Sequence, residues 1–216
     1  MIVATYFEKL DAFDQEDHQE LVKLWQRVWT ARGYEAVVLD RELAMEHPRA
    51  GELLEAVAKF PTVNDRAYET ACYLRWCAFA RLAKLQKQMI VAMDYDVFPT
   101  TKWKSEIFAQ DVPGVILTPV CFGHMPSCIQ LDGTSVELLV NLILWHQPDT
   151  ACRHTSDMTI LRAYKRQFAA RHDLLCYGQP GWRTKPLVHF GNWFMPPGPR
   201  TPLIASLLDE NLLVRV

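Results

Sequence analysis

Gln88-Met-Ile-Val-Ala-Met-Asp-Tyr-Asp-Val-Phe-Pro99 is the segment from which the architecture of this chain is predicted. Its apolar run, Met89–Met93, is entered from polar residues and stops at two carboxylates, Asp94 and Asp96. A short apolar run that contains β-branched residues and is bounded in this way is typical of a buried β-strand. Because side chains alternate along a strand, both carboxylates point to one side if the backbone stays extended to Asp96.

Two carboxylates at the end of a buried strand suit a divalent cation that carries a diphosphate. Ligands of open α/β sheets gather outside the carboxyl ends of the strands. Mg²⁺ and Mn²⁺ often bind one or two carboxylates together with substrate phosphates. The Asp-x-Asp triplet alone is a weak motif, and acids that merely solvate a strand end are the alternative. The position of Asp94 and Asp96 after a hydrophobic strand favours the metal site.

The chain before this segment alternates strands and helices. Ile2–Phe7 and Glu35–Leu39 are predicted strands, and the residues between them follow helical spacing until Gly33. This order predicts a right-handed parallel β-α-β unit. Two further helices, at Arg49–Phe60 and Asp65–Gln86, lead into the strand that ends at the acid pair. The pattern predicts a sheet covered by helices.

The chain after this segment is less regular. The predicted strands are Gly114–Thr118, Cys128–Leu131, Leu174–Tyr177 and Leu187–Phe190, and the predicted helices are Val136–His146, Ser156–Ala170 and Pro202–Leu213. The predicted fold class is α/β: one Rossmann-like domain with a mixed, mostly parallel central sheet flanked by helices. We expect residues 1–99 to form a nucleotide-binding half, 100–195 an acceptor and metal half, and 196–216 a C-terminal loop and helix.

Composition narrows the classes of partner. The 216 residues are 50% hydrophobic, and 23 basic against 25 acidic residues give a net charge of −2. The absence of a basic stripe disfavours nucleic acid as a partner, without excluding a modified base as the acceptor. The six cysteines are scattered without zinc-ligand spacing and are expected to be reduced thiols. With no signal peptide and no apolar run of membrane-spanning length, we predict a soluble, cytoplasmic protein without a membrane span.

A second informative segment is Trp182-Arg-Thr-Lys-Pro-Leu-Val-His-Phe-Gly-Asn-Trp193. It places His189 at the end of a short apolar strand, with Arg183 and Lys185 just before it. A lone histidine is more often a structural or surface residue than a ligand. The two cations also suit an ordinary solvated loop.

Taken in order, these motifs resemble the small nucleotide-sugar-dependent glycosyltransferases of the GT-A fold. The similar features are the first strand, the Trp-rich helix before Val37–Leu39, the Tyr73-Leu-Arg75 helix, the Asp-x-Asp triplet and Val188-His-Phe-Gly191, all between residue 1 and about 195. The resemblance implies a UDP-sugar as the donor and a glycan, protein or small molecule as the acceptor. It also implies that Asp94, Asp96 and His189 hold Mn²⁺ or Mg²⁺ on the donor diphosphate.

This chain departs from the family after the histidine. Many members continue with Lys-Pro-Trp, whereas His189 is followed here by Phe-Gly-Asn-Trp-Phe-Met-Pro-Pro. Arg183 and Lys185, which precede the histidine, are therefore the candidate phosphate-binding cations. Arg75, one helix before the acid pair, is a candidate for contact with the donor sugar or phosphate, and an exposed helix charge is its alternative.

The nucleotide side is assigned by position in the predicted sheet. Asp96 is expected to be the direct metal ligand because it lies further out from the strand, and Asp94 to contact ribose or reach the metal through water. Tyr6 and Phe7 end the first strand and Asp40 ends the second, where a base and a ribose lie in a doubly wound sheet. Core packing for Phe7 and helix capping for Asp40 are the alternatives.

The sequence leaves open whether transfer inverts or retains the configuration at the sugar carbon. An inverting enzyme needs a carboxylate base beside the acceptor hydroxyl, and a retaining enzyme needs none. Asp157, in a helix start that is similar to a family segment near the sugar and acceptor, is the first candidate, with N-capping as its alternative. Asp132 is the second candidate. Acceptor contacts are expected in the proline-rich loop that contains Cys121 and His124.

Two other functions also fit the sequence. A metal-dependent nucleotidyltransferase or phosphohydrolase predicts further carboxylates around the metal and no late histidine ligand. A non-catalytic nucleotide-binding α/β module predicts solvated acids and a histidine packed in a core. The glycosyltransferase hypothesis predicts that Asp94, Asp96 and His189 converge, although 93 residues separate the second acid from the histidine.

Overall fold

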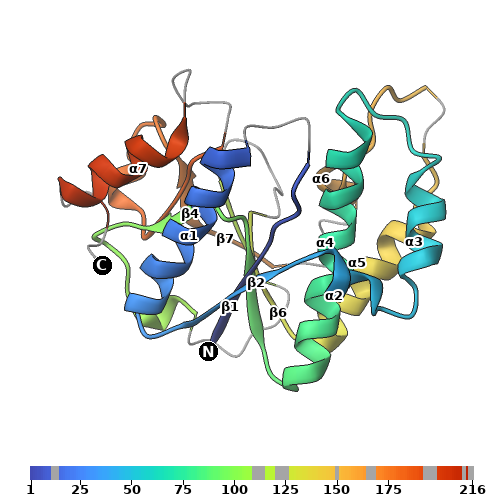
Figure 1. The fold of residues 1–216 in the computed structure, drawn as a ribbon, viewed down its shortest axis with the longest axis horizontal. Helices are drawn as coiled ribbons and strands as arrows, with labels where there is room; N and C mark the ends of the chain where they lie inside the picture. The colour runs from blue at the N-terminus through green and yellow to red at the C-terminus, as the bar shows by residue number, and fades with distance from the viewer. Residues whose placement is uncertain are drawn as a thin grey trace.

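The computed structural model describes residues 1–10, 15–108, 115–119, 127–148, 151–163, 169–191, 199–210 and 213. Within them, eight strands form one sheet, and helices cover both of its faces (Figure 1). The strands are β1 (Ile2–Tyr6), β2 (Glu35–Leu39), β3 (Ile90–Met93), β4 (Val97–Pro99), β5 (Val115–Pro119), β6 (Cys128–Leu131), β7 (Ala169–Cys176) and β8 (Leu187–His189). The helices are α1 (Gln15–Ala31), α2 (Arg41–Met45), α3 (Ala50–Val57), α4 (Arg66–Gln86), α5 (Gly133–Trp145), α6 (Asp157–Ala163) and α7 (Arg200–Asp209), with short 3₁₀ turns η1 (Ser105–Ile107) and η3 (Trp182–Thr184).

The sheet is mixed, with the strand order β2-β1-β3-β6-β5-β7-β8-β4. β1 is parallel to β2 and β3, and β7 is parallel to β5 and β8. β6 is antiparallel to β3 and β5, and β4 is antiparallel to β8. Strands β1, β2, β3, β5, β7 and β8 therefore share one direction, and their carboxyl ends lie at one edge. The predicted α/β class, with a mixed and mostly parallel sheet flanked by helices, is confirmed.

Side-chain alternation along the central strands builds a core on each face of the sheet. On β1, Ile2 packs with α3, α4 and α5, whereas Val3 packs with α1 and α7. Ile90 and Val91 of β3 divide between the two cores in the same way, and all four side chains are fully buried. Strands that are apolar on both faces are typical of a sheet covered on both sides. The apolar run before the acids is therefore a buried strand, as its sequence predicted.

The backbone does not stay extended as far as Asp96. β3 ends at Met93, and the Val97 amide donates to the Asp94 carbonyl over 3.1 Å, which closes a turn before β4 begins. The Asp94 amide donates to the Ser127 carbonyl over 2.9 Å. The expectation that strand alternation places both carboxylates on one side was therefore wrong, because a hydrogen-bonded turn brings them together instead.

Three other boundaries differ from the prediction. The helix expected at Ser156–Ala170 does not reach its predicted end, since α6 spans Asp157–Ala163 and β7 already begins at Ala169. β7 pairs with two neighbouring strands, and such pairing overrides the local helix propensity of alanine. The short helix α2 was not predicted, and the last helix begins at Arg200 instead of two residues later.

The described helices include none with the length and apolar character that a bilayer crossing requires. The described cysteines are free thiols, namely Cys72, Cys77, Cys128, Cys152 and Cys176. Of these, Cys176 contacts His189, a predicted site residue.

Candidate metal centre

The turn that carries Asp94 and Asp96 is held from two sides at the carboxyl edge of the sheet. Asp94 follows β3, and Asp96 precedes β4, which pairs with β8 so that Val97 lies opposite His189. The Phe190 amide donates to the Asp96 carbonyl over 2.9 Å and fixes the turn to the end of β8. The pairing of β4 with β8 therefore carries the histidine to the acids.

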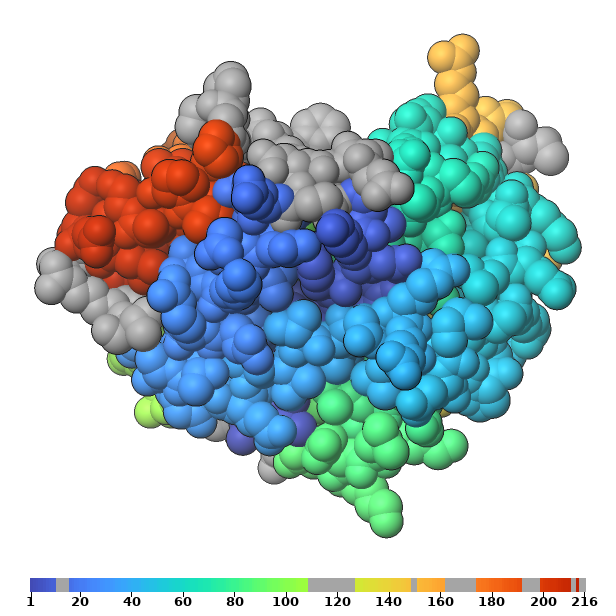
Figure 2. Space-filling model, in the orientation of Figure 1, coloured from blue at the N-terminus to red at the C-terminus, as the bar shows by residue number. Residues whose placement is uncertain are grey.

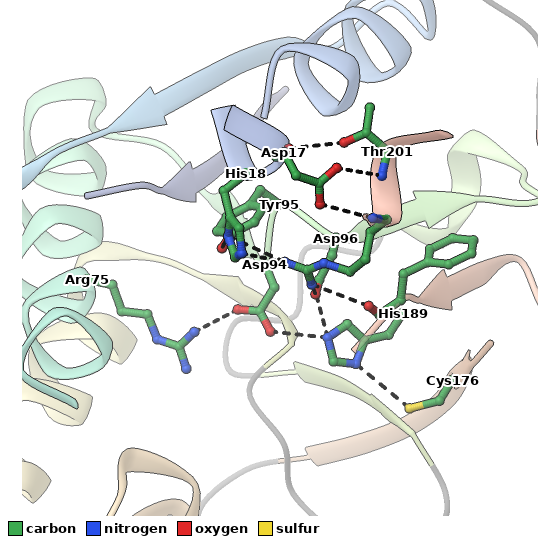
Figure 3. A network of polar contacts seen from close by, with 11 residues as sticks. Asp17, His18, Arg75, Asp94, Tyr95, Asp96, Cys176, His189 and Thr201 are labelled. Carbon is green, nitrogen blue, oxygen red and sulfur yellow. Dashed lines mark hydrogen bonds and ion pairs between the residues drawn. The ribbon is translucent and has the colours of Figure 1, made fainter. Parts of the chain in front are cut away.

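The three predicted metal ligands converge at this edge (Figure 3). The Nε2 of His189 lies 3.1 Å from Asp96 Oδ1 and 3.7 Å from Asp94 Oδ2. One ligand atom from each of the three side chains lies within 4.8 Å of the others. The convergence that the glycosyltransferase hypothesis predicts is thus present, across a sequence separation of 93 residues.

The donor atoms fit a hard or borderline divalent cation. Asp96 Oδ1 is buried and faces the His189 imidazole, with which it forms an ion pair when the ring is protonated. A buried carboxylate oxygen needs a positive or donating partner, and beside a neutral His189 a bound cation would be that partner. Carboxylate oxygens suit Mg²⁺ and Mn²⁺, and the imidazole nitrogen favours a softer ion than Mg²⁺.

Each acid also contacts an arginine. Arg75 on α4 reaches Asp94 Oδ1 at 2.7 Å, and Arg200 at the start of α7 reaches Asp96 Oδ2 at 2.7 Å. One oxygen of each carboxylate is therefore held by a guanidinium, and the other is turned toward His189. The sequence indicated Arg75 but missed Arg200, because a single arginine after Pro-Gly-Pro in the sequence carries no motif that links it to an aspartate 104 residues earlier.

Burial and neighbouring charges set the protonation of the three ligands. Burial alone raises the pKa of Asp96, but the charges of His189 and Arg200 outweigh it and hold that pKa well below its ordinary value. Burial raises the pKa of Asp94, and Arg75 offsets part of this effect. Burial alone lowers the pKa of His189, yet the adjacent Asp96 outweighs it and the pKa lies well above the usual range. The carboxylate of Asp96 and the imidazolium of His189 thus stabilise each other as an ion pair.

Two small residues fix the His189 ring. Cys176 Sγ lies 3.8 Å from His189 Nδ1, so the second ring nitrogen is turned away from the acids. A Cβ on Gly191 would lie 2.7 Å from His189 Cε1, which is closer than atoms of this kind approach. Ligating histidines generally need a partner that orients the ring. Here the Cys176 thiol contacts the second ring nitrogen, and the absence of a side chain at Gly191 leaves room for the ring.

Asp157 is tied to the same centre through Arg75. Its Oδ2 accepts hydrogen bonds from Arg75 Nε (3.1 Å) and NH2 (2.5 Å) and from Trp76 Nε1 (3.1 Å), while its Oδ1 accepts from the Met158 amide. The carboxylate is only 2% exposed. Ser156 takes the cap position of α6, since its Oγ accepts from the amide two residues beyond Asp157. The part of a catalytic base for Asp157 stays a prediction.

The other acid candidates cap helices. Asp132 Oδ1 accepts from the Ser135 amide at 2.7 Å at the start of α5, and Asp40 Oδ1 accepts from the Leu43 amide at 3.0 Å at the start of α2. Aspartate is among the preferred N-cap residues, so this local role accounts for both positions. Asp132 as a base and Asp40 as a ribose contact stay predictions.

The aromatic candidates lie at the end of β1. The Tyr6 hydroxyl donates to Glu8 Oε2 at 2.8 Å. Phe7 meets the ring of Tyr95, which stands between the two acids, edge to face at 5.8 Å. Phe7 therefore lies beside the acidic turn, whereas the Tyr6 hydroxyl is hydrogen-bonded to Glu8. Contacts of Tyr6 and Phe7 with a nucleotide stay predictions.

Arg183 and Lys185 lie at the other end of β8 from His189. The strand runs from Leu187 to the histidine, and the Lys185 carbonyl accepts from the Thr100 hydroxyl beyond the far end of β4. Arg183 stacks on Trp182, with its guanidinium carbon 4.6 Å from the ring centre. In the described part of the chain, no contact joins either cation to the acids or the histidine. Cys121 and His124 lie outside the described residues.

Comparison with known proteins supports the fold assignment. No family model and no curated protein sequence matches the chain. Among solved structures, a glycosyltransferase involved in the glycosylation of the major capsid of PBCV-1 matches with a TM-score of 0.52 and 9% identity, over 87% of this chain and 92% of that one. Mouse xyloside xylosyltransferase 1 in its apo form matches with a TM-score of 0.43 and 12% identity, over 91% and 99% of the two chains. The chain has the α/β fold of GT-A glycosyltransferases, with an Asp-x-Asp pair beside a histidine.

Proposed function

We propose that this protein is a metal-dependent glycosyltransferase that moves a sugar from a nucleotide diphosphate donor, a UDP-sugar, to an acceptor hydroxyl. The observation that carries the proposal is the meeting of Asp94, Asp96 and His189 at the carboxyl edge of the sheet, with Asp96 Oδ1 buried and facing the imidazole. The first half of the chain, residues 1–99, would bind the nucleotide, and residues 100–195 the acceptor.

The chemistry of sugar transfer explains this donor set. Negative charge grows on the diphosphate oxygen as the bond to the sugar breaks, and a bound divalent ion would neutralise that charge. Asp94, Asp96 and His189 would hold the ion. The mixed set of oxygen and nitrogen donors favours Mn²⁺ over Mg²⁺.

Charge balance at the centre favours joint binding of cation and diphosphate. The carboxylates of Asp94, Asp96 and Asp157 are opposed by the guanidiniums of Arg75 and Arg200. With a neutral His189, three negative charges face two positive ones, so a bare cation meets little excess negative charge. A diphosphate adds the missing charge, and the cation in turn screens the diphosphate from the acids.

Arg75 is the cation best placed to position the donor sugar. It is 2.7 Å from Asp94 and 2.5 Å from Asp157, so it joins the metal centre to the start of α6. Asp157 is fully engaged by Arg75 and Trp76, which favours a positioning part over proton abstraction. Phe7, next to Tyr95, would contact the nucleoside.

The rival hydrolase or nucleotidyltransferase fits less well. Such a site needs further carboxylates around the metal, whereas the described cluster that could hold an ion consists of two acids and a histidine. A non-catalytic module whose histidine sits in an apolar core is disfavoured by the ion pairs of His189 with both acids.

A donor-hydrolysis screen tests the proposal. UDP-, GDP- and TDP-sugars are incubated with the protein and Mn²⁺, and release of the nucleoside diphosphate is measured. We expect turnover with a UDP-sugar, its loss in Asp96→Asn and a strong decrease in His189→Gln. Asp65→Asn is the matched control, because an asparagine can still accept the Tyr68 amide at the cap of α4.

The screen also has outcomes that would overturn the proposal. Turnover that is equal in wild type, Asp96→Asn and His189→Gln would show that the acid pair and the histidine are not the site. Cleavage within the diphosphate, with release of UMP and a sugar phosphate, would instead favour the phosphohydrolase.

A further inference from the structure

We propose that Arg200 is a positioning residue of the metal centre: it holds one oxygen of Asp96 so that the other faces the metal site. The proposal rests on the proposed function above. It assigns to helix α7 a part in metal binding that neither the acid motif nor the histidine motif indicates.

Arg200 is buried although it starts a helix near the C-terminal end of the described chain. It is 7% exposed, and its NH1 lies 2.7 Å from Asp96 Oδ2 and 3.4 Å from the Phe190 carbonyl oxygen. A buried charge is tolerated only when it is paired and hydrogen-bonded. The guanidinium therefore has a fixed place between the acidic turn and the end of β8.

The consequence for Asp96 is a fixed rotation of its carboxylate. With Oδ2 on Arg200, Oδ1 is directed at His189 Nε2, 3.1 Å away. This orientation presents one oxygen to an ion and withholds the other. The planar guanidinium fixes such a geometry better than an ammonium group can, since its donors form a rigid fork.

Helix α7 is anchored independently of Asp96. The carboxylate of Asp17 on α1 accepts the backbone amides of Arg200 and Thr201, each at 3.0 Å, and the Thr201 hydroxyl donates to the Asp17 carbonyl at 3.0 Å (Figure 3). Figure 2 shows α7 in red against α1 in blue. The backbone of Arg200 is thus held by α1, and its side chain extends to Asp96 in the acidic turn.

Two further groups surround the guanidinium. NH2 of Arg200 lies 3.4 Å from both ring nitrogens of His18, and the guanidinium carbon lies 5.9 Å from the ring centre of Tyr95. His18 in turn contacts the Tyr95 hydroxyl at 2.6 Å. Together with Asp96, these groups contact the guanidinium and restrict its rotation.

Two effects of Arg200 on a bound cation oppose each other, so the direction in which the metal affinity changes on substitution tests the proposal. Its positive charge repels a divalent ion, so a purely electrostatic part predicts tighter metal binding when the charge is removed. Its hydrogen bond orients Asp96, so a positioning part predicts weaker binding. Loss of a residue that orients a metal ligand typically weakens the metal affinity about 10- to 100-fold, and we expect Arg200→Gln to fall in this range.

The experiment measures Mn²⁺ affinity in the presence of UDP by the loss of the free-ion electron paramagnetic resonance signal, together with the melting temperature. The variants are Arg200→Gln, Arg200→Lys and Asp96→Asn. Thr201→Val is the matched control, because it removes a hydrogen bond that anchors α7 to Asp17 but no contact with Asp96. We expect weaker Mn²⁺ binding in Arg200→Gln, partial retention in Arg200→Lys, and wild-type affinity in Thr201→Val.

The outcomes distinguish failure of this proposal from failure of the proposed function. Wild-type or tighter affinity in Arg200→Gln, with Asp96→Asn defective, overturns this proposal and leaves the proposed function standing. An equal loss in Thr201→Val shows that α7 acts only through stability and also overturns it. If Arg200→Gln does not fold, Arg200→Lys decides by the same comparison. Absence of Mn²⁺ binding in wild type with UDP overturns the proposed function and this proposal together.

Discussion

His189 Nε2 lies 3.1 Å from Asp96 Oδ1 although 93 residues separate them in the sequence. The contact follows from one short strand pair: β4 begins directly after Asp96 and runs antiparallel to β8, so that Val97 lies opposite His189. The amide of the next residue, Phe190, completes the connection to the Asp96 carbonyl. Backbone pairing thus determines where these two side chains meet.

Gly191→Ala should weaken metal binding by displacing the His189 ring. The added Cβ would lie 2.7 Å from Cε1, so either the imidazole or the backbone must move. We expect a loss of Mn²⁺ affinity of about 10-fold or more, comparable to the loss of an orienting partner, as measured by calorimetric titration with UDP present. Gly51→Ala in α3 is the control, because a Cβ there meets no atom within 4 Å. An unchanged affinity in Gly191→Ala would show that the ring position is not critical.

Cys176→Ala should have a smaller effect in the same direction. It removes the sulfur 3.8 Å from His189 Nδ1, so the ring loses the group that orients its second nitrogen. A several-fold loss of Mn²⁺ affinity is expected from the same titration. The control is Cys77→Ala, which truncates a buried cysteine of α4 away from His189 and should lower stability but leave the Mn²⁺ affinity unchanged. Equal Mn²⁺ affinities in the two variants would contradict an orienting role of Cys176.

Arg75→Met should destabilise the fold strongly. Arg75 is the common partner of the Asp94 and Asp157 carboxylates, and removing one partner of a buried ion pair typically costs about 3–5 kcal/mol. Urea denaturation measures the free energy of unfolding. Arg81→Met on the same helix is the control: its ion pair with Glu46 is partly exposed, and such pairs contribute about 0–1 kcal/mol. Similar losses for the two variants would show that the Arg75 network contributes little to the fold.

Glu69→Gln should change how stability depends on pH. Burial raises the pKa of Glu69 above its ordinary value of 4.5, so the folded state holds this proton more tightly than the unfolded state does. Stability is therefore lost as the pH rises above the unfolded pKa. The glutamine variant lacks this loss, so its melting temperature should match that of wild type in acid, exceed it by a growing amount as the pH rises from 4.5 through the raised pKa, and then keep a constant excess. A difference that is constant with pH would exclude this ionisation as the cause.

The sequence predicted those parts of the fold that depend on local patterns. The strands at Ile2–Tyr6, Glu35–Leu39 and Ile90–Met93 follow from short apolar runs, and the three metal-ligand candidates follow from their places at strand ends. β7 was predicted only in part, because its first residues form a strand through pairing with β5 and not through their own sequence pattern. Local propensity is a weak guide where a neighbouring strand supplies the hydrogen bonds.

The cations that contact the acids in the structure are not those that lie beside His189 in the sequence. Arg183 and Lys185 are near His189 in sequence, yet they precede β8 and so lie toward its opposite end. A strand rises about 3.3 Å per residue, so even a three-residue strand separates its two ends. Arg200 reaches Asp96 by the docking of α7 on α1. No pattern in one sequence indicates such a tertiary contact.

The most direct test of the central claim is the anomalous diffraction signal of manganese in crystals grown with Mn²⁺ and UDP. We expect one manganese peak bonded to Asp96 Oδ1 and His189 Nε2 and adjacent to Asp94, with the diphosphate on its open side. A manganese peak away from these three side chains, or an imidazole turned from the acid pair in the presence of the nucleotide, would contradict it.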